Sequence, residues 1–178
     1  MKSKQTKAMS FLQLAAERCS TRSFRTDPIP DEVIGRILEA GRLAPSAKNL
    51  QPWHFTLVQT PAMLEKVHAC YSRNWFHTAP AILIVSGRYE NAWVRPADSY
   101  NSLETDLAIT LDHMILAAAE EGVGTCWIGA FDLQVLKNAL GMDEKEEIFA
   151  FTPLGYPTKD FTPVPKNRKS LSEMTTYR

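Results

Sequence analysis

Two short cationic segments lie near opposite ends of the 178-residue sequence, and the first is Arg18-Cys19-Ser20-Thr21-Arg22. If this segment is extended, Arg18, Ser20 and Arg22 face the same way, because side chains alternate along a strand. If it is helical, the two arginines still share a face at a spacing of four. Guanidinium groups suit phosphate oxygens or the carbonyl edge of a ring. The segment therefore predicts an anion-binding group, and the alternative is two solvated arginines near a helix end.

The second cationic segment is Lys166-Asn167-Arg168, which follows Pro163-Val164-Pro165. The prolines restrict the backbone, and in an extended conformation Lys166 and Arg168 point to the same side. Alone, the segment is equally explained as a basic surface tail. Together the two segments offer up to four cationic groups to one dianionic phosphate, provided that the fold brings them together.

A third segment, residues 44–53, carries side-chain amides and a hydroxyl between two prolines. Ser46, Asn49 and Gln51 can each donate and accept hydrogen bonds. The segment falls between a predicted helix and a predicted strand, where ligand-binding loops are common. The alternative is a capping and turn segment, with Trp53 as an anchor in the core, and for Trp53 itself we favour that anchor.

A fourth segment, Gly122 to Phe131, joins the longest predicted helix to a strand. It does not match G-x-G-x-x-G and it opens a strand, so it is no dinucleotide-binding fingerprint. Gly129 and Ala130 are small enough for their backbone N–H groups to approach a planar ligand closely. The alternative is ordinary helix termination followed by a tight connection.

The elements that must position these segments alternate between helix and strand along a single domain, 1–178, without repeats or an evident linker. Such alternation indicates an α/β or α+β class around one sheet. The hydrophobic spacing and capping residues predict helices that start at Ser10 and Pro30 and helices over 61–70, 101–121 and 132–140. Short apolar runs predict strands over 54–58, 81–85, 125–128 and 148–154, with a loop over 87–100.

The predicted helix over 101–121 is apolar nearly all round, which places it in the middle of a structure or across a subunit interface. The tail over 161–178 is polar, contains prolines and has little apolar content for a core of its own. We therefore expect it to pack on another surface, and a partner subunit is one candidate. Residues 1–9 are polar and lysine-rich, and we expect them to be flexible.

Composition narrows the class of protein. Lys plus Arg and Asp plus Glu both number 20, and this balance argues against a general nucleic-acid binder. The three cysteines, Cys19, Cys70 and Cys126, form no C-x-x-C pair, which favours a reducing, cytoplasmic setting. No secretory signal or membrane span is expected, because no long apolar run occurs. No metal site is expected, because metal-ligand spacing is missing among His54, His68, His77 and His113.

Taken in order, the segments resemble the nitroreductase family over about residues 11 to 168. The motifs are Arg18-x-Ser20-x-Arg22, Ala44-Pro45-Ser46-x-x-Asn49-x-Gln51-Pro52-Trp53, Gly122-x-Gly124-Thr125-Cys126-Trp127-Ile128-Gly129, Leu154-Gly155-Tyr156-Pro157 and Lys166-x-Arg168. The resemblance implies an α+β, three-layer fold whose central, mainly antiparallel sheet is flanked by helices, in an intertwined homodimer. It also implies FMN in each of two interface pockets.

The resemblance further implies three groups of FMN contacts. The phosphate and nearby ribityl atoms would be held by Arg18, Ser20, Lys166 and Arg168, with Arg22 at the pyrimidine edge and Cys19 contributing mainly its backbone. The other subunit would supply Pro45, Ser46 and Ala47, with Asn49 and Gln51 as additions. The flavin near its N5 edge would be lined by Trp127, Ile128, Gly129 and Ala130.

The function implied is an FMN-dependent oxidoreductase. Hydride would pass from NAD(P)H to flavin N5 and then, in a ping-pong sequence, to a nitroaromatic, quinone or similar acceptor. Arg22 would stabilise the anionic reduced flavin, and no protein side chain would act as acid, base or nucleophile.

Departures from the family pattern are Cys19, where many members have a basic residue or histidine, and Gly129, where some larger members have an acid. The chain also lacks the additional helices that cover the pocket of larger members. The alternatives are a flavin-fragmenting or dehalogenating enzyme on the same fold and a non-catalytic flavin-binding protein.

Overall fold

The computed structural model describes residues 9–178, so the segment predicted to be flexible lies, except for Met9, outside the described residues. Its helices are α1 (Phe11–Glu17), α2 (Asp31–Arg42), α3 (Pro61–His68), α4 (Leu103–Glu120), α5 (Leu133–Leu140) and α6 (Leu171–Met174). Its strands are β1 (Trp53–Val58), β2 (Ala81–Gly87), β3 (Gly124–Thr125) and β4 (Glu147–Gly155). Three short 3₁₀ turns are η1 (Ala47–Asn49), η2 (Asn74–Thr78) and η3 (Tyr89–Asn91).

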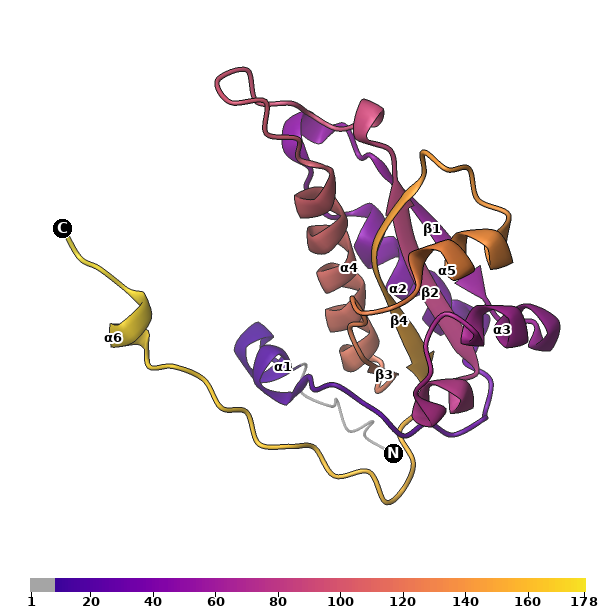
Figure 1. Ribbon diagram of the computed structural model, residues 1–178. Helices are drawn as coiled ribbons and strands as arrows, with labels where there is room; N and C mark the ends of the chain where they lie inside the picture. The colour runs from indigo at the N-terminus through magenta and orange to yellow at the C-terminus, as the bar shows by residue number, and fades with distance from the viewer. Residues whose placement is uncertain (1–8) are drawn as a thin grey trace.

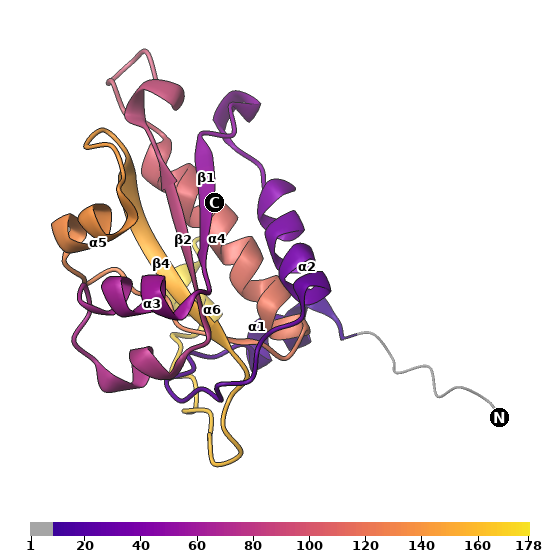
Figure 2. The same cartoon turned by 90° about the vertical axis from the view of Figure 1, so that its right-hand side faces the viewer.

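The four strands form one antiparallel sheet in the order β1-β2-β4-β3, between two layers of helices. α2 and α4 cover one face of the sheet, and α3 and α5 cover the other (Figures 1 and 2). This arrangement confirms the predicted α+β fold with three layers. The helices predicted from capping residues also form; Ser10, for example, caps α1 in a reciprocal capping box with Gln13.

The central strand β2 is buried along its whole length, and its side chains alternate between two cores. Leu83 and Val85 belong to the core against α2 and α4, whereas Ile82 and Ile84 belong to the core against α3 and α5. An unbroken apolar run is what a strand with a helical layer on each face requires. The run at 81–85 therefore predicted this buried strand.

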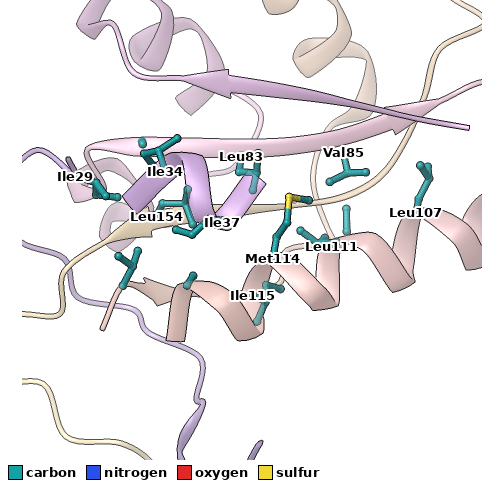
Figure 3. Packing of buried hydrophobic residues seen from close by; sticks show 14 of the residues in the cluster. Ile29, Ile34, Ile37, Leu83, Val85, Leu107, Leu111, Met114, Ile115 and Leu154 are labelled. Atoms are coloured by element: carbon teal, nitrogen blue, oxygen red, sulfur yellow. The ribbon is translucent and has the colours of Figure 1, made fainter. Parts of the chain in front are cut away.

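The core between the sheet and the helices α2 and α4 is closely packed (Figure 3). Ile37 of α2 and Met114 of α4 are fully buried in it. The two helices approach at Gly41, where an added Cβ would lie 2.6 Å from the Met114 sulfur, and the Thr110 hydroxyl donates to the Gly41 carbonyl at 2.8 Å. α4 is therefore fixed to the rest of the fold along its length.

The strand predicted over 125–128 is shorter in the structure. β3 covers only Gly124–Thr125, and pairing with β4 resumes as a single bridge between Ile128 and Phe151. Between these points the Cys126 N–H donates to the Thr152 side-chain hydroxyl at 3.0 Å instead of to a backbone carbonyl. A buried side-chain oxygen thus takes the place of a backbone carbonyl as the acceptor, and the apolar pattern of the sequence does not reveal this exchange.

The tail beyond the sheet extends away from the body, and α6 stands apart from it (Figure 1). This helix was not predicted, although Ser170 caps it in a reciprocal capping box with Glu173. Leu171 and Met174 on this helix are 78% and 62% exposed. These exposed apolar side chains are available for the packing of the tail on another subunit, which stays a prediction. Within residues 9–178, no helix has both the length and the apolar character that a membrane crossing requires.

A histidine pair, His68 and His77, lies beside the core that packs against α3 and α5. His68 stacks on His77, with ring centroids 4.5 Å apart, and its buried Nε2 has no hydrogen-bond partner among the described residues. Burial, and then the neighbouring His77, lower the pKa of His68 from its usual 6.5. The unfolded chain therefore binds the proton more readily than the folded chain does.

We predict that the free energy of unfolding falls as the pH falls through about 6.5 towards the lower pKa of folded His68. His68→Phe, which keeps an aromatic ring in the pair, should flatten this decline in urea titrations at several pH values and fixed protein concentration. His54→Gln, which removes an exposed histidine, is the matched control. An unchanged pH dependence in His68→Phe would refute the assignment.

Candidate functional site

The two cationic segments that the sequence separates meet in the structure. They line opposite sides of one open cleft of about 310 Å³. The lining residues are Arg18, Cys19, Ser20, Arg22, Val164, Pro165, Lys166, Asn167 and Arg168. The arrangement gathers four cationic side chains and one hydroxyl around a single hollow.

Backbone pairing with β3 positions the first segment. The Thr21 N–H donates to the Thr125 carbonyl at 2.8 Å, and Ser20 and Thr125 form a parallel bridge. The segment is therefore extended, so that Thr21 points into the protein while Ser20 and Arg22 line the cleft. Thr21 packs directly on Gly124, where an added Cβ would lie 2.7 Å from its hydroxyl oxygen.

A long-range contact with α1 holds the second segment. The Lys166 ammonium donates to the Ala15 carbonyl at 2.5 Å. Ala15 lies in the last turn of α1, where backbone carbonyls lack partners within the helix. A cation is also favoured at that end of a helix. The bond fixes the start of the tail beside Arg18, which follows α1 directly.

The positive charge of the cleft is not neutralised by any ion pair in the described part of the chain. Among residues 9–178, none of the four cations Arg18, Arg22, Lys166 and Arg168 forms an ion pair. Burial, and then the charges of Arg18 and Arg168, lower the pKa of Lys166. Like charges held together without a counter-ion favour the binding of an anion.

A buried thiol lies against the same side chains. Burial raises the pKa of Cys126, and the positive charge of Arg22, hydrogen bonding to Ser20 and Arg22, and the charge of Arg18 oppose that rise. These effects place the thiol beside the cleft-lining face of the first segment. The thiol favours its neutral form, because burial is the largest of these influences.

Of the four residues after Cys126, one belongs to the core and three are accessible to solvent. Ile128 is only 3% exposed, and both its N–H and its carbonyl are bonded to Phe151. Its side chain therefore belongs to the core, and its place near the flavin stays a prediction. Gly129 and Ala130 are exposed, and neither backbone N–H donates a hydrogen bond to another described residue.

Trp127 is 39% exposed, and its ring meets that of Phe149 edge-on, with centroids 6.1 Å apart. Phe149 is the extra residue of a β-bulge, because Ala150 pairs with Val85 and Ile148 pairs with Ser86. Bulges redirect side chains, and here the bulge turns an aromatic ring outward to Trp127. The sequence reasoning missed Phe149, because a bulge is not visible in an apolar pattern.

The segment containing Pro45, Ser46, Ala47, Asn49 and Gln51 lies elsewhere. The Ala47 N–H donates to the Asp106 carboxylate near the start of α4, whereas Arg18 and Gly124 line a hollow beside Ala119 near the end of that helix. At about 1.5 Å per residue, roughly 20 Å of helix separates Asp106 from Ala119. Within one chain, the structure therefore does not bring this segment to the cationic cleft (Figure 1).

A larger hollow, of about 710 Å³, lies between residues 50–56 and residues 140–146. Its cation, Arg88, is paired with Glu146 at 3.1 Å, Asp143 at 3.3 Å and Glu90 at 3.7 Å. Neighbouring carboxylates therefore neutralise Arg88. The cations of the smaller cleft have no ion pair among the described residues, so that cleft is the better candidate for an anionic ligand.

The model of the nitroreductase family matches residues 15–69 and 61–156, which is most of the chain. The chain belongs to the nitroreductase family. A protein of Archaeoglobus fulgidus, provisionally named an NADH dehydrogenase/NAD(P)H nitroreductase, is 31% identical over 158 residues, covering 84% of this chain and 88% of that protein. Nitroreductase family membership makes this chain an oxidoreductase.

Solved structures agree with the family assignment. A nitroreductase family protein from Clostridium difficile superimposes with a TM-score of 0.85 at 26% identity, covering 95% of this chain and 98% of that one. A nitroreductase with bound FMN from Bacteroides fragilis superimposes with a TM-score of 0.72 at 25% identity, covering 89% of this chain and 94% of that one.

A more distant relative in sequence is the rat protein iodotyrosine deiodinase 1, which is 23% identical over 94% of this chain and 69% of its own length.

We predict that Gly124→Ala destabilises the fold by about 1–3 kcal/mol, the usual cost of an overpacked contact. The added methyl meets the Thr21 side chain, which cannot move without breaking the pairing of its segment with β3. Gly35→Ala is the matched control, because an added Cβ there meets nothing within 4 Å and alanine favours the helix. Denaturant midpoints measure both effects, and equal midpoints for the two variants would contradict the contact.

Proposed function

We propose that this protein is an FMN-dependent NAD(P)H oxidoreductase that reduces nitroaromatic, quinone or similar acceptors. The observation that carries the proposal is the cleft in which four cations, unpaired within the described residues, lie beside a segment with free backbone N–H groups. The first feature suits a phosphate, and the second suits the polar edge of a planar ring. FMN joins these two groups in one molecule.

The cleft suits a phosphomonoester in charge and in donor type. Arg18 and Arg168 provide guanidinium groups, Lys166 an ammonium and Ser20 a hydroxyl. Burial, and then the charges of Arg18 and Arg168, lower the pKa of Lys166, and a dianionic phosphate would offset the repulsion between these charges. We assign these four residues to the phosphate and the neighbouring ribityl atoms, with Cys19 contributing mainly through its backbone.

The ring would extend from the phosphate towards Cys126 and Gly129. We assign Arg22 to the pyrimidine edge, where its charge would stabilise the anionic reduced flavin. Its place beside Cys126, one residue before Trp127, supports this role. The N–H groups of Gly129 and Ala130 are the donors available for the N5 edge, and Trp127 is the aromatic wall next to them.

A second copy of the chain would complete the site. Pro45, Ser46 and Ala47, with Asn49 and Gln51, are too far along α4 to reach the cleft of their own subunit. In a two-fold dimer with antiparallel α4 helices, the start of one helix lies beside the end of the other. The half-buried Ile109 and Leu116 on α4, and the exposed apolar side chains of α6, would gain cover in such a homodimer.

Bound FMN supplies hydride acceptance at N5 and two-electron delivery to an acceptor, and the chain's own residues provide position and charge. Arg22 would hold positive charge near the ring, the exposed N–H of Gly129 would be available as a hydrogen-bond donor, and Trp127 would limit access of water from one side. One exposed site would serve donor and acceptor in turn, which gives a ping-pong order.

Reductive dehalogenation is the second candidate, and the similarity to iodotyrosine deiodinase 1 favours it. It would use the same cofactor site, so the choice of acceptor distinguishes the two activities. A flavin-binding protein without turnover is the remaining alternative.

We predict that the purified protein is yellow, releases FMN and consumes NADH or NADPH steadily when a nitroaromatic or quinone is supplied. A ping-pong order predicts parallel lines in double-reciprocal plots of rate against donor at several acceptor concentrations. Anaerobic flavin reduction by each nicotinamide, followed by reoxidation with quinone, nitroaromatic and halotyrosine, identifies the acceptor class. Protein that cannot be loaded with FMN would refute the proposal, and loaded protein without turnover would establish the binding alternative.

We predict that replacing Arg18 and Arg168 together by alanine weakens FMN binding at least about a hundredfold, since each charge-assisted contact contributes about 1.5–3 kcal/mol. Fluorescence quenching of FMN measures the affinity directly. The control is Arg42→Ala, which removes an exposed arginine that is paired with Glu39 on α2. Unchanged FMN affinity in the double variant would exclude the cleft as the phosphate site.

A further inference from the structure

We propose that Asp106 is a positioning residue that holds segment 45–51 in the conformation in which it enters the flavin site of a second subunit. This inference rests on the proposed function, and it assigns a role to a side chain that does not itself reach the cleft. Asp106 is only 2% exposed, whereas the other acids of α4, Glu104, Asp112 and Glu120, are exposed. Buried carboxylates are rare unless their oxygens have specific partners.

The two carboxylate oxygens of Asp106 have different partners. Oδ2 accepts a hydrogen bond from the Ser102 hydroxyl at 2.8 Å, within the start of α4. Oδ1 accepts a hydrogen bond from the Ala47 N–H at 3.0 Å, and this bond ties segment 45–51 to the helix. Asp106 has no ion pair within residues 9–178. One carboxylate oxygen therefore accepts a bond from the start of the helix, and the other accepts a bond from segment 45–51.

The conformation that Asp106 holds is an unfavourable one. Lys48, Asn49 and Gln51 have φ values of 50°, 56° and 51°, in the left-handed region that residues other than glycine avoid. The Gln51 N–H donates to the Ser46 hydroxyl at 2.9 Å, which closes the turn from within. Such positions persist only where the surroundings determine them, and they are concentrated at binding sites.

Burial does not explain why this conformation is kept. Lys48, Asn49 and Gln51 are exposed, so they contribute little to the core of their own chain. A loop whose shape did not matter could relax, whereas this one is tied to α4 by a buried carboxylate. Preforming a binding segment avoids the entropy cost of ordering it when the ligand binds. The fixed shape is therefore best explained by a surface that is presented to a ligand.

The same helix links the two halves of the proposed site. The start of α4 carries Asp106 and hence segment 45–51, and its end adjoins Gly124, on which the Arg18–Arg22 segment packs. Because α4 is a continuous helix from Leu103 to Glu120, both halves keep a fixed separation. A partner with an antiparallel α4 would then receive the segment at a defined position.

The first test separates the two bonds of Asp106. In Asp106→Ala the segment loses its tie, and we expect FMN affinity to fall at least about tenfold, as measured by fluorescence quenching. Asp106→Asn keeps an oxygen for the Ala47 N–H and should retain affinity within about twofold. Ser102→Ala removes the other bond of the same carboxylate and is the matched control, with affinity near that of the wild type.

If Asp106→Ala does not fold, Asp106→Ser takes its place. Its hydroxyl can bond back to the Ser102 carbonyl but is too short to reach Ala47. Wild-type protein that binds no FMN would refute the proposed function itself. Wild-type protein that binds FMN, with an Asp106→Ala or Asp106→Ser variant that binds it equally well, would refute only the role of Asp106.

The second test asks whether the segment acts across subunits. Chains carrying Asp106→Ala are mixed with chains carrying Arg18→Ala and Arg168→Ala, and mixed dimers are isolated by two affinity tags and sized by light scattering. In a mixed dimer, one site combines both defects and the other combines both intact halves. We expect one tightly bound FMN per mixed dimer, although neither parent homodimer binds it tightly. Mixed dimers without a restored site, or a wild-type protein that remains monomeric when loaded, would overturn the proposal.

Discussion

Four cations held in one cleft without an ion pair among the described residues are the feature on which the proposed site depends. Two hydrogen bonds to backbone carbonyls position the segments that carry Arg18, Arg22, Lys166 and Arg168. The Thr21 N–H bond to Thr125 fixes the first segment along β3, and the Lys166 bond to the Ala15 carbonyl fixes the second. The rigid sheet and helices hold positive charge in place for an anion, which loose surface side chains could not do.

The fold could be read from the sequence to a large extent, because its signals are local. The buried run at 81–85 predicted the central strand, and Ser10 and Pro30 marked the starts of α1 and α2. The shortening of β3 could not be predicted, since it depends on the Thr152 hydroxyl, which is distant in sequence and replaces a backbone acceptor. α6 was missed because its apolar residues, such as Leu171, have no local partner.

The candidate site could be predicted by residue type but only partly by arrangement. The chemistry of the two cationic segments was evident, yet their meeting depends on a contact between residues 151 positions apart. The pairing of Ile128 with Phe151, which buries its side chain between exposed neighbours, likewise depends on the fold. Asp106 gave no distinct signal, because α4 also carries Glu104 and Asp112, and its partner Ala47 could be identified only from the fold.

The bond between Lys166 and Ala15 also has a consequence for the order of events during synthesis. Contacts between residues far apart in sequence form late, because most of the chain must exist before they can close. The sheet and α4 can assemble on a growing chain, whereas the cleft requires a chain that extends to Arg168. A nascent chain therefore emerges from the ribosome with its scaffold ahead of its proposed anion site. Capture of an anionic cofactor follows the synthesis of nearly the whole described domain.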